Sequence, residues 1–312
     1  MKLSQVVAAY VAHRQGMGMR FHTEARVLRS FCRALRDVSM DEITADQVLV
    51  FLTGTGPITR YWERKHSALS GLYRFAVARG HVDHSPLPRT VPRPQQTFVP
   101  YIYSHEELRR LFDVVVANDH PCCRIDPDTF RTILLLLYGA GLRISEALAL
   151  TLADVDLDAR ILCVRESKFY KTRLVPIGDD LLRILSSYTA RRRPPHVEPS
   201  SPFFVSRSGT AVTRQNAEMA FCRLRVRADV VCEAADARHQ PRLHDLRHAF
   251  AVHRLVSWYR DGADVQRLLP HLATYLGHVH IAGTQRYLTL TPELLRQASL
   301  RFERYAMEPS HE

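Results

Sequence analysis

A proline-rich stretch limits the possible folds of this chain more than any other feature of its sequence. Five of the 17 prolines fall within fifteen residues, namely Pro86, Pro88, Pro92, Pro94 and Pro100. Proline lacks the backbone N–H that helices and sheets require, so this stretch favours extended, semi-rigid chain. Because 312 residues are enough for two domains, the sequence predicts a helical domain at 1–84, a basic linker at 85–103 and a second domain at 104–312.

The first predicted domain is entirely helical. Apolar residues recur at helical spacing, as in Val27, Leu28 and Phe31. Thr44 is typical of an N-cap, and a fourth helix is expected from about 59 to 80, where glycine suits the position after a helix end. This domain is therefore expected to be a small helical bundle.

The second predicted domain is mainly α with a small antiparallel β-sheet. It opens with a capping box from Ser104 to Glu107. Two β-rich runs, at 161–166 and 173–177, flank a short lysine-bearing turn and indicate a hairpin. Helices are expected at 127–139, 143–152, 179–190, 213–230, 242–258, 263–276 and 292–305.

The charge balance favours a polyanionic partner. Lys+Arg 43 against Asp+Glu 32 leaves a net charge of +11, and most of the basic residues are arginines, whose planar group matches phosphate oxygens. A basic protein with solvated charged faces and no particular partner is the alternative. The residues expected to contact a polyanion are Arg60, Arg64, Lys65, Arg74, Arg89, Arg93, Lys171 and Arg173.

Other function classes find little support in the sequence. No apolar run approaches the ~20 residues of a membrane-spanning helix. The N-terminus has the pattern of an amphipathic helix and lacks the cleavage site of a signal peptide. The six cysteines show no CxxC spacing, so we expect reduced thiols in a cytoplasmic protein and no metal site.

Several residues have the chemistry needed to break a phosphodiester. Without a metal, such a reaction needs cations at the phosphate oxygens, an in-line nucleophile and a proton for the leaving oxygen. Arg143 is predicted at a helix N-terminus, where backbone N–H groups favour an anion, and Glu146 is within reach to hold its guanidinium or cap the helix. His244 and Arg247 are three residues apart and share a helix face. Taken singly, each also fits an ordinary structural role.

A third segment offers a nucleophile. His278 follows a glycine that ends a helix, and Tyr287 lies nine residues later. A phenol has a pKa of about 10, so it needs a base or nearby cations to lose its proton at neutral pH. Most of the 12 tyrosines are expected in the core or on the surface, so Tyr287 becomes a candidate only when it is considered together with the other segments.

Taken together, these segments resemble the tyrosine recombinase, or phage integrase, family across nearly the whole chain. The matching residues, in order, are Arg143, Lys168, His244 and Arg247 in an HxLR box, His278 in a Leu-Gly-His box, and Tyr287. A lone HxxR is a weak signal, but four ordered boxes at family-like spacing are a specific one. The segment LLPHLATYLGHVHIAGTQRYL further resembles recombinases carried by transposons.

The resemblance implies a mechanism without metal or nucleotide cofactor. Tyr287 would attack phosphorus to give a 3′-phosphotyrosine and a free 5′-hydroxyl, while Arg143 and Arg247 bind the phosphate. Lys168 would protonate the leaving oxygen. His244 and His278 would hydrogen-bond the phosphate and assist proton transfer from the tyrosine. The turn SKFYKTR lacks the glycines common in the family, so Lys171 stays an alternative to Lys168.

The resemblance also implies partners. The two domains would form a clamp around double-stranded DNA, and a homo- or hetero-tetramer of recombinases would act on two DNA sites. Residues 292–305 are a candidate for exchange between protomers, and packing within their own chain is the alternative. Neither the DNA target nor the choice among integration, excision and resolution follows from the sequence.

Three competing functions remain open at this point. A type IB topoisomerase would use the same chemistry to relax DNA, although the separate N-terminal helical arm favours a recombinase. A degenerate, non-catalytic DNA-binding relative is disfavoured by the full set of catalytic residue types. A basic helical scaffold for RNA lacks the aromatic-rich motif that RNA recognition commonly uses.

Overall fold

The chain divides into two compact units, Met1–Thr97 and Phe98–Glu312. The computed structural model describes residues 1–56, 58–92, 100–117, 123–165, 172–191, 198–232, 240–278, 280–289, 296 and 299–300. Each unit has its own hydrophobic core.

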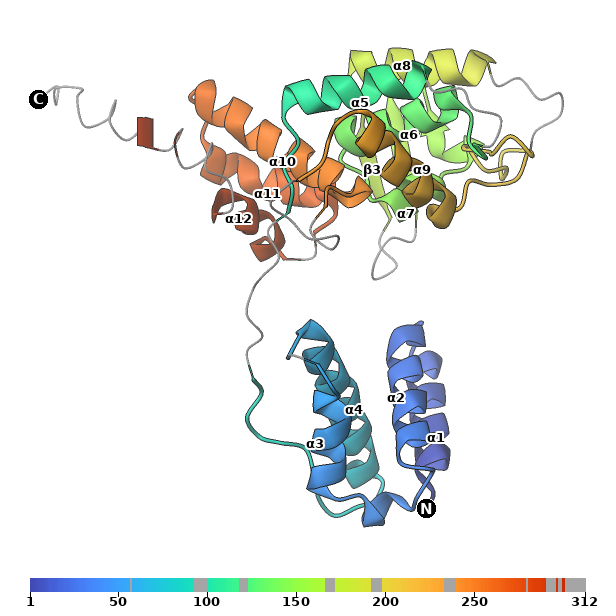
Figure 1. Ribbon diagram of the computed structural model, residues 1–312, viewed down its shortest axis with the longest axis vertical. Helices are drawn as coiled ribbons and strands as arrows, with labels where there is room; N and C mark the ends of the chain where they lie inside the picture. The colour runs from blue at the N-terminus through green and yellow to red at the C-terminus, as the bar shows by residue number, and fades with distance from the viewer. Residues whose placement is uncertain are drawn as a thin grey trace, which may run out of the picture. The chain divides into compact units, whose positions relative to one another are not determined.

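In the described part of the first unit, four α-helices form a bundle (Figure 1). They are α1 (Leu3–Gly16), α2 (His22–Ala34), α3 (Ala45–Thr53) and α4 (Arg60–Ala78), with a 3-10 turn at Met40–Glu42. Helix α4 contacts the other three, and Phe31, Leu69 and Leu72 are fully buried between them. The predicted N-cap is confirmed, because the Thr44 hydroxyl accepts a hydrogen bond from the Gln47 N–H at 3.3 Å.

The second unit is mainly helical with a small sheet, as the sequence predicts (Figure 1). Its helices are α5 (His105–Ala117), α6 (Pro127–Gly139), α7 (Ile144–Leu148), α8 (Asp179–Arg191), α9 (Arg214–Arg227), α10 (Leu243–Arg260), α11 (Val265–Leu276) and α12 (Ala282–Thr289). The predicted capping box is present, since Ser104 and Glu107 bond each other's backbone N–H groups.

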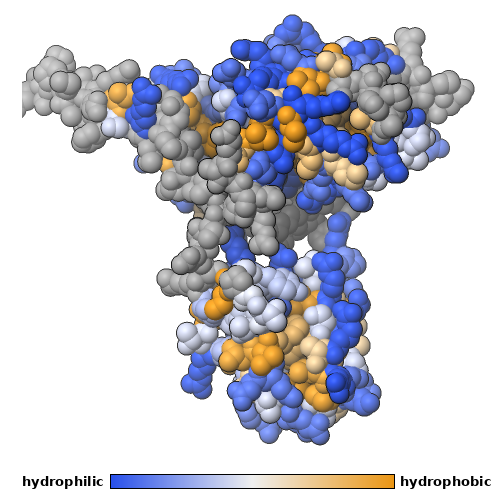
Figure 2. Space-filling model, viewed as in Figure 1, coloured by the Kyte–Doolittle hydropathy of each residue, from blue (hydrophilic) through white to orange (hydrophobic). Residues whose placement is uncertain are grey.

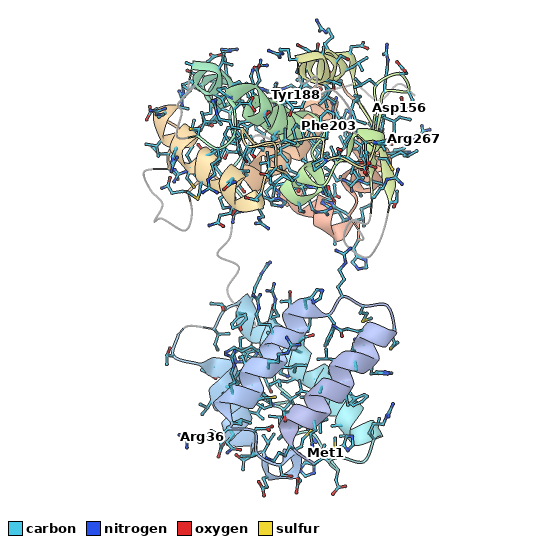
Figure 3. The ribbon with its side chains drawn as sticks, turned by 90° about the vertical axis from the view of Figure 1, so that its right-hand side faces the viewer. Met1, Arg36, Asp156, Tyr188, Phe203 and Arg267 are labelled. Carbon is cyan, nitrogen blue, oxygen red and sulfur yellow. The ribbon has the colours of Figure 1, made fainter. Side chains whose placement is uncertain are left out.

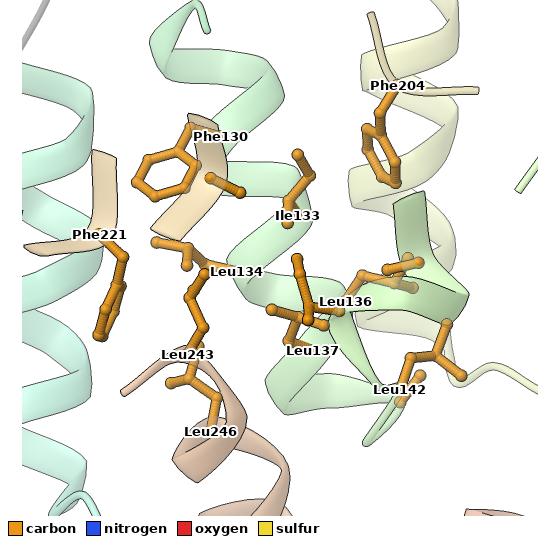
Figure 4. Close-up of a cluster of buried hydrophobic side chains, with 14 of the residues drawn as sticks. Phe130, Ile133, Leu134, Leu136, Leu137, Leu142, Phe204, Phe221, Leu243 and Leu246 are labelled. Atoms are coloured by element: carbon orange, nitrogen blue, oxygen red, sulfur yellow. The ribbon is translucent and has the colours of Figure 1, made fainter. Parts of the chain in front are cut away.

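Helix α6 forms the centre of this unit. It contacts α5, α7, α8 and α10, so its side chains are surrounded by other helices. Figure 4 shows Leu134, Leu136 and Leu137 of this helix among buried side chains from other elements, which include Phe204, Phe221 and Leu243. The apolar run in α6 is therefore the core around which the helices that bear the candidate site are packed.

The sheet has three antiparallel strands in the order β1 (Val155–Asp156), β2 (Ile161–Val164) and β3 (Arg173–Pro176). Strands β2 and β3 pair as predicted, with Cys163 opposite Leu174. The two-residue strand β1 was not predicted. The lysine-bearing turn between β2 and β3 lies outside the described residues.

One helical expectation needs correction, and one helix was not predicted. The helix expected over 143–152 ends at Leu148, because Thr151 bonds the Asp154 carboxylate and starts a separate 3-10 turn at Leu152–Asp154. Helix α12 was not predicted at all. The helix expected over 292–305 falls almost entirely outside the described residues.

On the face shown in Figure 2, both units mix polar and apolar residues. Val50 in α3 and Leu174 in β3 are 72% and 62% exposed. By contrast, Tyr188 and Phe203, labelled in Figure 3, pack in the core of the second unit with their ring centroids 5.5 Å apart. Within the described ranges, every helix is too short or too polar to cross a membrane.

Candidate active site

The first candidate arginine lies where α6 gives way to α7. Gly141 turns the chain there with a φ of +59°, and a Cβ at this position would lie 2.5 Å from the Phe250 ring. Arg143 follows as the N-cap of α7. Its backbone N–H and its guanidinium both donate to Glu146, at 3.0 and 2.5 Å, and the guanidinium also donates to the Gly277 carbonyl at 3.2 Å. Glu146 therefore both caps the helix and holds the guanidinium.

The second candidate arginine is fully buried. Arg247 in α10 is 1% exposed and donates to the Gly141 carbonyl at 2.6 Å and to the Leu276 carbonyl. The two carbonyls lie at two turns of the chain. The first is the turn at Gly141, and the second is the end of α11, where Gly277 has the left-handed conformation with a φ of +67°. Two glycine-dependent turns thus fix the guanidinium in place.

Glu146 is the common partner of three arginines. Both of its carboxylate oxygens accept from Arg173, at 3.1 and 2.9 Å, and Arg247 lies 3.8 Å away. Burial acts to raise the pKa of Glu146, but the hydrogen bonds and charges of Arg173 and Arg143 outweigh it and hold the pKa at about 2. One carboxylate against three guanidiniums leaves a positive excess, which suits an anionic ligand.

The two predicted histidines lie beside these arginines. Desolvation by neighbouring groups, and then the charges of Arg247 and Arg143, lower the pKa of His278, which is half-buried, and of His244, which lies exposed at the surface. Both imidazoles are therefore neutral at pH 7. His278 forms a hydrogen bond of 2.7 Å between its Nδ1 and the hydroxyl of Thr284 in α12, which fixes the orientation of the ring.

Tyr287 is buried against the same group of residues. It is 3% exposed on α12, a helix that contacts α10 and α11. Its hydroxyl lies 2.9 Å from Nδ1 of His248, and its ring centroid lies 6.2 Å from that of His278. The structure thus brings together Arg143, His244, Arg247, His278 and Tyr287.

Other predicted site residues have different placements. Arg60, Arg64 and Arg74 are exposed on α4, and Arg89 is exposed after it. Lys65 is half-buried and donates to the Phe51 carbonyl at 2.7 Å. The residues that lie outside the described ranges are Arg93, Lys168 and Lys171.

Two residues of the cluster have roles that sequence reasoning missed. Arg173 was expected to contact DNA, but its side chain is 11% exposed, and its guanidinium donates to Glu146 and to the Tyr275 carbonyl. His248 was not singled out, although it directly follows Arg247. The signal in the sequence was a second histidine one helical turn after His244, which places both imidazoles on one side of α10.

Comparison with known proteins identifies the family. Residues 104–293 match the Phage integrase family. The chain is 35% identical over 308 residues to "Putative integrase/recombinase y4rB" of Sinorhizobium fredii (strain NBRC 101917 / NGR234), covering 96% of each chain. It is 33% identical over 265 residues to the tyrosine recombinase XerC of Chlorobaculum tepidum, covering 79% of this chain and 74% of the relative. The chain belongs to the phage integrase family, and within it to the tyrosine recombinases, which are enzymes.

Solved structures share the fold. The Tn1549 transposon integrase in complex with a circular intermediate DNA superposes with a TM-score of 0.70 at 16% identity, covering 97% of this chain and 99% of that one. The XerH recombinase bound to a palindromic DNA substrate, in a post-cleavage complex, gives a TM-score of 0.65 at 19% identity, and the match covers 96% of this chain and 84% of that one. Among the described residues of the present chain, no group of histidine, cysteine, aspartate or glutamate side chains forms a candidate metal site.

Proposed function

We propose that this protein is a site-specific DNA recombinase that cleaves and rejoins DNA through a 3′-phosphotyrosine at Tyr287. One observation carries the proposal: the buried Tyr287 hydroxyl belongs to the same cluster as Arg143, Arg247 and His278. A phenol, two guanidiniums and neutral imidazoles are the groups that phosphodiester cleavage by a protein nucleophile requires.

The two arginines bind the scissile phosphate. Each is already held by carbonyl or carboxylate groups, so little reorganisation is needed when charge develops on the phosphate oxygens. Truncating either one should cost roughly 10²–10³ in rate, as for other preorganised oxyanion donors. His244 and His278, both neutral, hydrogen-bond the same phosphate.

The reaction exchanges one phosphoester for another. The Tyr287 oxygen attacks phosphorus, the bond to the 5′-oxygen breaks, and Lys168 gives that oxygen a proton. The lysine assignment rests on the family resemblance, with Lys171 as the alternative. Attack by a 5′-hydroxyl on the phosphotyrosine reverses these steps, so the energy of the phosphoester is kept and no metal or nucleotide is required.

Double-stranded DNA is the proposed partner. The net charge of +11 and the exposed arginines of α4 support phosphate contacts by a core-binding domain at 1–84, joined by the linker at 85–103 to a catalytic domain at 104–312. We further propose a tetramer on two DNA sites and a role in a mobile element, which the transposon integrase among the structural neighbours supports at the level of fold.

Covalent capture tests this function. Purified protein is incubated with a library of nicked random duplexes, and DNA that stays attached after denaturation is sequenced. We expect a selected site and an adduct that Tyr287→Phe abolishes without lowering the melting temperature. An adduct formed by Tyr287→Phe would contradict the nucleophile assignment, and binding without any adduct would favour a non-catalytic accessory protein.

A second measurement separates a recombinase from a type IB topoisomerase. Two differently labelled duplexes that carry the selected site are incubated together with the protein. Joined products with exchanged partners indicate recombination. Relaxation of supercoiled circles without exchanged partners would indicate a topoisomerase.

A further inference from the structure

We infer that His248 is the group that accepts the proton of the Tyr287 hydroxyl when the tyrosine attacks phosphorus. This inference rests on the proposed function and assigns one step of it to a residue outside the set that the sequence indicated. His248 touches the reacting oxygen itself, since its Nδ1 lies 2.9 Å from the hydroxyl. That distance is typical of a hydrogen bond and short enough for direct proton transfer.

The two histidines expected to assist the tyrosine make other contacts. Nδ1 of His278 is 2.7 Å from the Thr284 hydroxyl, and its ring centroid is 6.2 Å from that of Tyr287. The His244 ring packs edge-on against the His248 ring, with centroids 4.7 Å apart. The position next to the phenol oxygen is therefore occupied by His248, which leaves His244 and His278 for the phosphate.

The surroundings of His248 favour a neutral ring. Burial, and then His244 and the charges of Arg247 and Arg242, with His278 in addition, lower its pKa to about 3. At neutral pH the ring therefore has one free nitrogen lone pair. With its proton on Nε2, the imidazole accepts the tyrosine hydroxyl at Nδ1. A bound phosphate adds negative charge beside these cations and so favours the imidazolium that forms on proton transfer.

The proposed step balances as follows. The bond from the Tyr287 oxygen to phosphorus forms as the bond from that oxygen to its hydrogen breaks, and the proton moves to Nδ1 of His248. The bond from phosphorus to the 5′-oxygen breaks, and Lys168 supplies the proton for that oxygen. During rejoining, a 5′-hydroxyl gives its proton back to Lys168 and attacks phosphorus, the bond from phosphorus to the Tyr287 oxygen breaks, and the His248 imidazolium returns its proton to the departing phenolate.

The same helix provides a matched control. His253, also in α10 and half-buried, has its Nδ1 2.9 Å from the hydroxyl of Tyr138. Burial, and then His105, lower its pKa to about 4. His253 thus reproduces the contact of His248 with a tyrosine that belongs to no part of the candidate site.

The test is single-turnover cleavage of the DNA site selected by covalent capture, using nicked duplexes with either oxygen or sulfur at the 5′ bridging position. A thiolate leaves without a proton, so sulfur removes the need for Lys168 only. We expect His248→Phe to slow cleavage about 10²–10⁴-fold on both substrates. The cleavage rate of the His253→Phe control should stay within about threefold of the wild-type rate. The slow cleavage by Lys168→Ala should return toward the wild-type rate on the substrate with sulfur at the 5′ bridging position.

The pH dependence distinguishes proton transfer from mere support of the fold. In His248→Phe, only tyrosine that has ionised by itself can attack, so the rate should rise about tenfold per pH unit between pH 7 and 9. The wild-type rate should rise far less. His248→Asn keeps a hydrogen-bond acceptor but no base, and should show the same pH slope with wild-type thermal stability.

The outcomes separate the two claims. No adduct from the wild-type protein would overturn the proposed function and this inference with it. An adduct from wild type, together with His248 variants within about threefold of its rate, would overturn the inference alone. The inference would also be overturned if the cleavage rate of His248→Phe returned to the wild-type rate on the sulfur substrate. The same holds if His248→Phe and His248→Asn both kept the wild-type pH slope, since His248 would then not accept the tyrosine proton.

Discussion

The arginines of the candidate site in the second unit and those on α4 in the first unit differ in how they are held. Arg143 and Arg247 in the second unit donate to backbone carbonyls, and Arg143 also donates to the buried carboxylate of Glu146. Arg60, Arg64 and Arg74 in the first unit stand exposed on α4. Fixed guanidiniums can act on a transition state because their orientation is set before DNA arrives. Exposed ones mainly attract phosphates, an effect that salt screens.

Within this comparison of arginines, the largest effect is expected at Arg247. Arg247→Lys keeps the charge but cannot reach both the Gly141 and Leu276 carbonyls with a planar fork. We expect cleavage to fall roughly 10²–10³-fold, which is about 3–4 kcal/mol. Single-turnover rates at saturating protein measure this. A loss below about tenfold would show that a fixed orientation matters less than charge.

The second effect concerns Glu146 and acid. Because its pKa in the folded protein is about 2, below the ordinary 4.5, its ionised form stabilises the fold above about pH 4.5, and this contribution is lost as pH falls toward 2. The contribution is on the order of 3 kcal/mol. Glu146→Gln should therefore be less stable than wild type at pH 6, with the gap narrowing by about half at pH 3. Urea unfolding at the two pH values measures this, and a constant gap would contradict it.

Lys65 should behave like a fixed cation although it lies on α4. Its Nζ donates to the Phe51 carbonyl near the end of α3 and lies 4.8 Å from the Phe51 ring centroid. Burial lowers the pKa of this lysine. Lys65→Gln should cost about 1 kcal/mol of stability because the charged hydrogen bond is removed. Thermal melting measures the loss, and the salt dependence of DNA binding should change little.

The smallest effect on stability is expected for the exposed pair Arg60 and Arg64. Replacing both with Gln should change the unfolding free energy by less than about 0.5 kcal/mol. The slope of log K against log salt should decrease by about 0.9 for each DNA phosphate that the variant no longer neutralises. Binding titrations at several salt concentrations measure this. An unchanged slope would remove α4 from the proposed DNA-binding surface.

Local sequence signals predicted local structure well. Helix α6 has the predicted bounds, and the caps at Thr44 and Ser104 form as expected, because caps and apolar periodicity depend on neighbours in the chain. Helix α12 was missed because, among its six residues whose side chains are described, Thr284 and Tyr287 are the buried ones, too few for a recognisable apolar stripe.

Contacts between distant segments could not be predicted in the same way. Arg173 meets Glu146 across 27 residues, and His248 meets Tyr287 across 39. In a sequence, Arg173 looks like any other basic residue after a lysine-bearing turn. His248 lies about 100° around the helix from Arg247, and only the packing of α12 decides which side chain it meets.

The main-chain anchoring of the two arginines has an evolutionary consequence. The carbonyls of Gly141, Leu276 and Gly277 are present whatever side chains surround them. Selection must therefore preserve the turns, and in particular their two glycines with positive φ, but can leave most neighbouring side chains to drift. Descendants of such a chain can change the side chains around the site while the two guanidiniums that we propose to bind the phosphate keep their orientation.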